Sequence, residues 1–197
     1  MTNGRLLRVL ASCALLVWAG SARAQWELDG ARSALNFISI KNNNVAETHG
    51  FAALLGYIGG DGKVRLTINL DSVATLIDVR NQRMREMLFE TATFPAATIT
   101  GMIDPAVLAA VGEGGTVLTE LPVTLSLHGK ERSLTVPVAV VGEGEGRMQV
   151  FSQRPVIVNA ADFGLDAGVA ALQKVAGLQA ISTAVPVTFH LVFSNGK

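Results

Sequence analysis

The sequence has few of the residues on which disulfides, metal centres and nucleic-acid sites depend. Its one cysteine is Cys13, close to the N-terminus, and charged residues make up 16% of its 197 residues, below the typical share of about 25%. A disulfide framework or a thiolate metal centre therefore has no ligands in the body of the chain. Basic and acidic residues number 16 each, so there is no excess positive charge to bind nucleic acid.

Motifs of catalysis and metal binding are also missing. No G-x-S-x-G motif occurs, and Ser126 near His128 has no third residue to orient a nucleophilic pair. The histidines, His49, His128 and His190, are far apart in sequence. Because His190 alternates with apolar neighbours and His128 lies at a turn, we interpret all three as exposed polar residues. The sequence predicts no metal site, no cofactor and no enzyme.

The first 24 residues have the features of a secretory signal peptide. Basic residues precede an apolar run over residues 9–19, which is too short for a membrane span of about 20 residues. Small residues then form the A-x-A pattern Ala22-Arg23-Ala24. We expect cleavage after Ala24, which leaves residues 25–197 with 13 basic and 16 acidic residues and a net charge of −3. Leu10-Ala11-Ser12-Cys13 resembles a lipoprotein cleavage box, an alternative that the few preceding apolar residues disfavour.

Regular alternation of apolar and polar residues predicts β-strands with one solvated face. It is clearest at residues 64–70, 123–128, 134–140 and 185–193. Shorter strands are expected at residues 26–28, 35–40, 97–103, 148–150 and 156–158. Residues 45–58 are long enough for one strand that bends near Gly50 or for two short strands. Short helices are expected at residues 79–94, 104–111 and 162–177. The predicted fold class is all-β with short helices, in the form of a closed antiparallel eight-stranded barrel, whose interior holds packed side chains or one small apolar ligand.

The pleat of the strands predicts which side chains face the barrel interior, with Arg65, Thr67 and Thr188 outside. Met84 and Leu88 lie in the expected helix at 79–94, where they either pack against the barrel or form a flexible apolar lip over its mouth. The candidate residues of an apolar cavity are Phe37, Phe51, Leu66, Ile68, Met84, Leu88, Ile99, Leu125, Leu127, Val136, Phe189 and Leu191.

Short motifs in order along the chain carry a resemblance to a known family. They are Trp26-x-x-Asp29-x-x-x-Ser33, Phe51-x-x-Leu54-x-Gly56-x-Ile58, Leu88-Phe89-Glu90 with Phe94-Pro95, Leu125-Ser126-Leu127-His128-Gly129 and Asp162-Phe163-Gly164. None is specific alone, but together they resemble the YceI family of exported lipocalin-like barrels over essentially all of residues 25–197. The resemblance implies a polyisoprenoid lipid as ligand and, because members often pair, a homodimer.

The sequence departs from the family pattern at three places. The usual His-Ser pair is Arg32-Ser33, the usual glycine two residues before Phe51 is His49, and the arginine-aspartate-x-histidine-leucine element is replaced by Arg80-Asn81-Gln82-Arg83-Met84. The resemblance therefore carries over the barrel and its apolar cavity, and no polar contact to a headgroup.

Two functions from different classes follow from these features. The favoured hypothesis is a non-catalytic periplasmic carrier, not spanning the membrane, that holds a long isoprenoid lipid or isoprenoid quinone in the barrel. The other is an exported barrel filled by its own side chains, which acts as a protein-interaction or stress-response module. The volume inside the barrel discriminates between them, because the carrier requires an apolar cavity and the module requires none.

Overall fold

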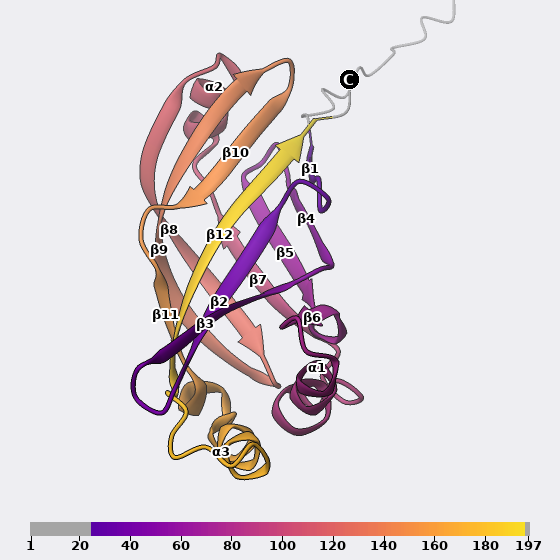
Figure 1. The fold of residues 1–197 in the computed structure, drawn as a ribbon. Helices are drawn as coiled ribbons and strands as arrows, with labels where there is room; N and C mark the ends of the chain where they lie inside the picture. Colours follow the sequence, from indigo (N-terminus) through magenta and orange to yellow (C-terminus); the bar gives the residue numbers. More distant parts are fainter. Residues whose placement is uncertain (1–24, 196–197) are drawn as a thin grey trace, which may run out of the picture.

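The computed structural model describes residues 25–195. In this range the chain forms a twelve-stranded sheet and three α-helices (Figure 1). The predicted signal peptide, residues 1–24, lies outside the described residues, so its cleavage after Ala24 stays a prediction.

The strands follow the alternating segments of the sequence. They are β1 (Trp26–Leu28), β2 (Ala34–Lys41), β3 (Val45–Phe51), β4 (Leu54–Ile58), β5 (Lys63–Asn69), β6 (Val73–Ala74), β7 (Ala96–Met102), β8 (Thr116–Leu127), β9 (Lys130–Gly144), β10 (Arg147–Ser152), β11 (Val156–Asn159) and β12 (Ala184–Ser194). In β5 the pleat places Leu66 and Ile68 in the interior and leaves Arg65 exposed, as the alternation predicts.

The predicted closed antiparallel barrel of eight strands is confirmed. Its ring runs β1-β4-β5-β7-β8-β9-β10-β12 and closes where β12 pairs with β1. The strands β2, β3 and β6 continue from β12, and β11 pairs with the first half of β12. Because β12 is eleven residues long, one half of it completes the ring while the other half carries these extra strands (Figure 1).

Tight turns set the strand pairing. In the β8–β9 hairpin Leu127 pairs with Lys130, which leaves His128 and Gly129 as the two loop residues, both with positive φ of 51° and 72°. That is the geometry of a two-residue hairpin turn whose twist matches its strands, and glycine adopts it without steric cost.

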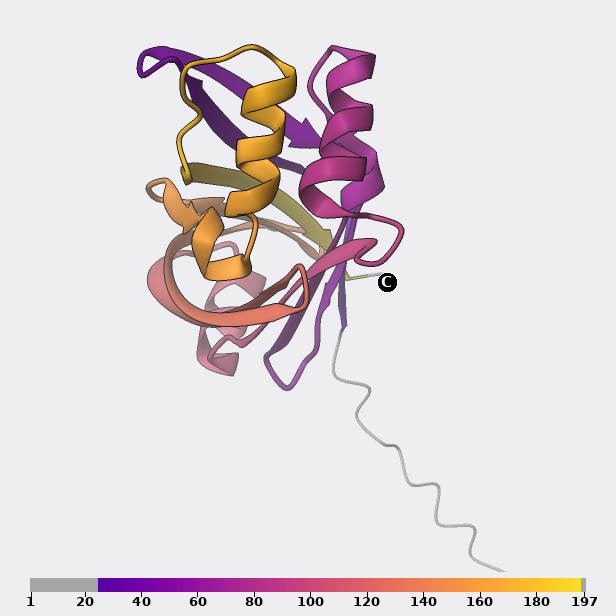
Figure 2. The same cartoon turned by 90° about the horizontal axis from the view of Figure 1, so that it is seen from below.

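The helices cover the two ends of the barrel. Helix α2 (Pro105–Gly112) lies at the upper end, where Asp104 accepts a hydrogen bond from the Ala106 amide at 2.8 Å and Pro105 begins the helix. Helices α1 (Asp78–Arg83) and α3 (Asp166–Val175) lie side by side across the lower end (Figure 2). No helix within residues 25–195 is long and apolar enough to cross a membrane.

Both helices at the lower end are shorter than predicted. After Arg83 the segment continues as a single π-helical stretch, η2 (Met84–Phe89), which ends at Glu90 in a left-handed conformation. The helix predicted from residue 162 begins at Asp166, because Gly164, with φ of 70°, separates it from the 3₁₀ turn η3 (Ala160–Phe163). Apolar spacing predicted these helices, but not the backbone irregularities within them.

Candidate functional site

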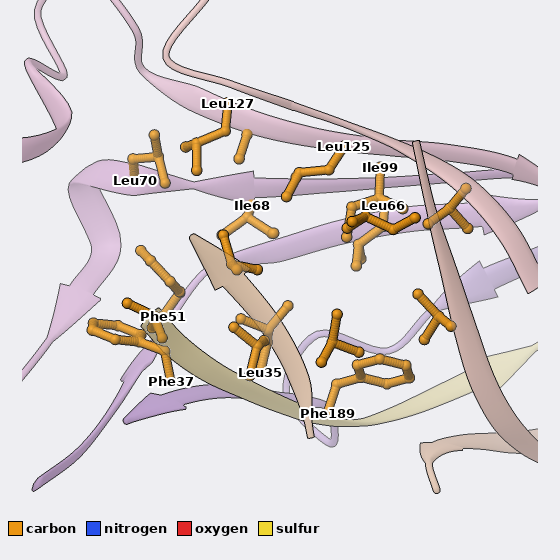
Figure 3. Close-up of a pocket in the computed structure, with 18 of the residues that line it drawn as sticks. Leu35, Phe37, Phe51, Leu66, Ile68, Leu70, Ile99, Leu125, Leu127 and Phe189 are labelled. Atoms are coloured by element: carbon orange, nitrogen blue, oxygen red, sulfur yellow. The ribbon is translucent and has the colours of Figure 1, made fainter. Parts of the chain in front are cut away.

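The barrel encloses a cavity that reaches its lower end. The volume of this cavity is about 220 Å³, and each residue that lines it is Ala, Val, Leu, Ile or Phe. Figure 3 shows side chains from strands on opposite sides of the barrel pointing into this shared space. A cavity with such a lining offers no polar partner, so it favours an apolar occupant and disfavours water.

The upper end of the barrel is filled by its own side chains. Six large residues there, Trp26, Ile58, Ile103, Met148, Val140 and Phe193, are at most 5% exposed and none lines the cavity. The barrel is therefore packed at the end under α2, and the cavity reaches from Val64, the cross-strand partner of Ile58, down to η2 and α3.

Neighbouring strands build the cavity wall in matched rows. Leu66 on β5 pairs with Ile99 on β7, and Ile99 pairs with Leu125 on β8. Paired residues lie on the same face of the sheet, so one inward leucine fixes the orientation of the next two side chains. The row forms one side of the cavity in Figure 3, opposite Phe189 of β12.

Ten of the twelve candidate cavity residues line this space. They are Phe37, Phe51, Leu66, Ile68, Leu88, Ile99, Leu125, Leu127, Val136 and Phe189. The other two, Met84 and Leu191, are buried in the packed core and do not line it. Leu191 faces inward but lies toward the solid end, where β12 pairs with β10. Met84 packs as a core residue, which is one of the two roles expected for it.

The lower end of the cavity is closed by η2 and α3. Leu88 and Phe89 of η2 and Val169 of α3 are all part of its lining. The two elements approach closely, since a Cβ placed on Gly168 would lie 2.6 Å from the Met87 carbonyl oxygen.

The interpretation of the histidines as exposed is wrong for His49, which is 4% exposed. It precedes Phe51 by two residues on β3 and pairs across with Phe37 of β2, so it shares their inward face. The period-two pattern that placed Phe51 in the cavity also places His49 inside, which sequence reasoning missed. His128 and His190 are half-buried; His190 lies on the outer face, with Nε2 2.8 Å from the Gln149 side-chain oxygen.

A cluster of polar groups surrounds His49. The Ser39 hydroxyl lies 2.9 Å from His49 Nε2, and one oxygen of Glu47 lies 2.7 Å from Lys41 Nζ and 2.6 Å from Arg80 Nη1. The hydrogen bond from Lys41, together with the nearby Arg80 charge, lowers the pKa of Glu47. Burial, with Arg80 adding repulsion, lowers the pKa of His49 and favours a neutral imidazole.

Metal-ligating side chains do not gather in the part of the chain that the structure describes. Within residues 25–195 no three His, Cys, Asp or Glu side chains lie close enough to hold a metal ion. His49, His128 and His190 each have separate neighbours: Ser39 for the first, the Phe163 carbonyl for the second and Gln149 for the third.

The chain can now be compared with known proteins of this fold. The model of the YceI-like domain family matches residues 26–193. The chain belongs to the YceI family. No curated protein matches it, but several solved structures of the same fold do.

One solved structure is similar in sequence as well as in fold. It is a polyisoprenoid binding domain from Saccharophagus degradans implicated in plant cell wall breakdown, 42% identical, with a TM-score of 0.84 over 87% of this chain and 98% of that one. Burkholderia cenocepacia BcnA is 22% identical, with a TM-score of 0.65 over 84% of this chain and 98% of its own. The Campylobacter jejuni YceI protein is 15% identical, with a TM-score of 0.53 over 76% of this chain and 84% of its own; these last two show the shared fold.

Proposed function

We propose that this YceI-family protein is a periplasmic carrier that binds a long isoprenoid lipid, a polyprenyl lipid or an isoprenoid quinone, without catalysing a reaction on it. The observation that carries the proposal is the cavity whose lining is entirely apolar. The 42% identical Saccharophagus degradans domain, described as polyisoprenoid binding, supports the same class of ligand.

Apolar burial supplies the affinity in this proposal. Removing apolar surface from water is worth about 25 cal/mol per Å², so about 300 Å² of buried prenyl chain contributes about 7.5 kcal/mol before the costs of association. That is enough for binding without a polar contact. The cavity also favours the carrier over the interaction module, for which a filled barrel is expected.

The size of the cavity limits how the lipid enters. Its volume of about 220 Å³ is below the about 300–1,000 Å³ that is usual for drug-sized ligands. A long chain therefore occupies the cavity in part, or η2 and α3 move apart and enlarge it. The second route is available because the closure is made by side chains and short helices and not by the hydrogen-bonded wall of the barrel.

Native mass spectrometry and solvent extraction of the protein from its own periplasm test the proposal. We expect a protein with Gln25 as its first residue, carrying a mass increment that extraction identifies as an isoprenoid. Repeated recovery of empty protein, which also fails to bind added polyprenol or quinone, would overturn the carrier role. Recovery from another compartment would overturn the location alone.

The oligomeric state is a separate proposal. The exposed apolar side chains on β4, Leu55 at 72% and Tyr57 at 39% exposed, offer a surface for a homodimer. Light scattering after gel filtration should give twice the mass of residues 25–197, and a monomer at all concentrations would contradict it.

A further inference from the structure

Buried polar residues are scarce in this barrel. Within residues 25–195 only His49 and Thr75 are polar and buried. Thr75 has partners, since its hydroxyl lies 2.6 Å from the Asn81 side-chain oxygen. His49 is only half satisfied: its Nε2 lies 2.9 Å from the Ser39 hydroxyl, but its Nδ1 is buried without a hydrogen-bond partner. A buried polar atom of this kind is costly, and a native protein that keeps one needs a reason such as a bound group.

The position of His49 connects it to the cavity. On the inward face of β2 the cavity residues Leu35 and Phe37 are followed by the polar Ser39, and on β3 Phe51 is preceded by His49 and then Glu47. The His49 ring lies 5.2 Å from the ring of Phe37. The interior surface thus changes from apolar to polar just beyond Phe37, which is where an amphipathic lipid would place its headgroup.

The two cations nearest His49 are already engaged within the protein. Lys41 and Arg80 both contact the same Glu47 oxygen, and Arg80 also donates to the Thr75 carbonyl at 2.5 Å. Their charges are therefore partly compensated within the protein. His49 itself favours the neutral form because it is buried, so it offers a hydrogen bond without a charge.

We propose that His49 Nδ1 forms a hydrogen bond to a neutral oxygen, a hydroxyl or a carbonyl, on the headgroup of the isoprenoid lipid. The inference rests on the proposed carrier function and adds the chemistry by which one isoprenoid is preferred over another. Ser39 sets the role of Nδ1: it is a donor when the Ser39 hydroxyl donates to Nε2, and an acceptor when Nε2 donates to Ser39. A hydroxyl group satisfies both tautomers, which makes an alcohol the best probe.

The test compares ligands that share one tail. Wild-type protein is mixed with geranylgeraniol and with the hydrocarbon that has the same chain but no hydroxyl group. Native mass spectrometry then gives the ratio of the two complexes. We expect wild type to prefer the alcohol, and His49→Phe to reduce that preference about tenfold, the value of one hydrogen bond. His49→Gln, which keeps a polar group, should retain part of the preference.

His190→Phe is the matched control, since it makes the same change on the outer face. It should leave the alcohol preference of wild type unchanged, and thermal unfolding should show that each variant is folded. Because His49→Phe removes a buried unpartnered nitrogen and keeps a ring against Phe37, we expect it to fold. If it does not, His49→Gln and Ser39→Ala still test the contact, since each should lower the preference.

The outcomes separate this inference from the carrier proposal. Wild type that binds neither alcohol nor hydrocarbon would overturn the carrier function. Wild type that binds both without preference, or a preference that survives in His49→Phe, would overturn the headgroup contact and leave the carrier intact; a buried water would then satisfy Nδ1. Stronger binding of geranylgeranyl diphosphate than of the alcohol would replace the neutral headgroup by an anionic one.

Discussion

Gly168 of α3 lies directly against Met87 of η2, so close that a Cβ on Gly168 would be 2.6 Å from the Met87 carbonyl oxygen and 2.9 Å from the Cα of Leu88. Both contacts are with backbone, which cannot turn aside as a side chain can. Gly168→Ala should therefore push α3 away from η2, lower the free energy of unfolding by about 1–3 kcal/mol, and speed release of bound isoprenoid. Thermal unfolding and ligand-exchange rates measure the two effects.

Gly112→Ala is the control for that substitution. Gly112 ends α2 at the solid end of the barrel, and a Cβ there meets nothing within 4 Å. Alanine should be neutral or stabilising by up to about 1 kcal/mol because of its helix propensity. Equal unfolding temperatures and exchange rates for the two variants would show that the contact of Gly168 with Met87 does not hold the closure.

Leu66→Trp tests whether the hollow is the ligand site. Leu66 lines the cavity at mid-barrel, where an indole would fill space that the lipid needs while keeping the interior apolar. We expect the variant to stay folded, with an unchanged or higher unfolding temperature, and to lose binding of quinone or polyprenol.

Leu55→Trp makes the same change on the outer surface, at a side chain that is 72% exposed, and should bind as wild type does. If Leu66→Trp lowers the free energy of unfolding by the about 1–3 kcal/mol that overpacking costs, the interior is solid. If it is stable and still binds lipid as tightly, the ligand does not occupy this cavity.

Stability should depend on pH through His49. Its pKa in the folded protein lies below the ordinary 6.5, so between that lowered value and 6.5 the unfolded chain binds a proton that the folded protein does not. The stability that the folded protein has with a neutral His49 is therefore fully present above pH 6.5, and it is lost as the pH falls below that value. Urea unfolding should show wild type losing stability between pH 7.5 and 5.5 relative to His49→Phe.

The other titrating group of the cluster acts in a different pH range. The pKa of Glu47 is lowered from 4.5, so its contribution is present above pH 4.5 and is lost only below that value. His128 and His190 are present in both wild type and His49→Phe, so their effects on stability cancel when the two proteins are compared. Parallel stability curves for the two proteins from pH 7.5 to 5.5 would contradict the role of His49.

Leu76 combines full exposure with backbone strain. It is 99% exposed and has a φ of 63°, a left-handed conformation that costs a leucine roughly 1–2 kcal/mol. Asparagine tolerates this conformation, so Leu76→Asn should raise the free energy of unfolding by about 1 kcal/mol. Leu118→Asn, also at an exposed leucine but within strand β8, should not stabilise. A fall in stability for Leu76→Asn would show that Leu76 makes a contact that offsets its strain.

The sequence by itself determined the barrel and the character of its lining, because period-two alternation is a local property that each strand carries. It placed Leu66, Leu125 and Phe189 on the cavity, and the same rule, applied to β3, would have placed His49 inside. Only the tertiary structure decided which end of the barrel is packed and which end the cavity reaches, since packing volume depends on side chains from every strand at one level. It also decided that Arg80 contacts Glu47, 33 positions away, and that Gly168 packs against Met87. Folding of the sheet brings these segments together, and the local sequence pattern of one segment does not predict its contact with the other.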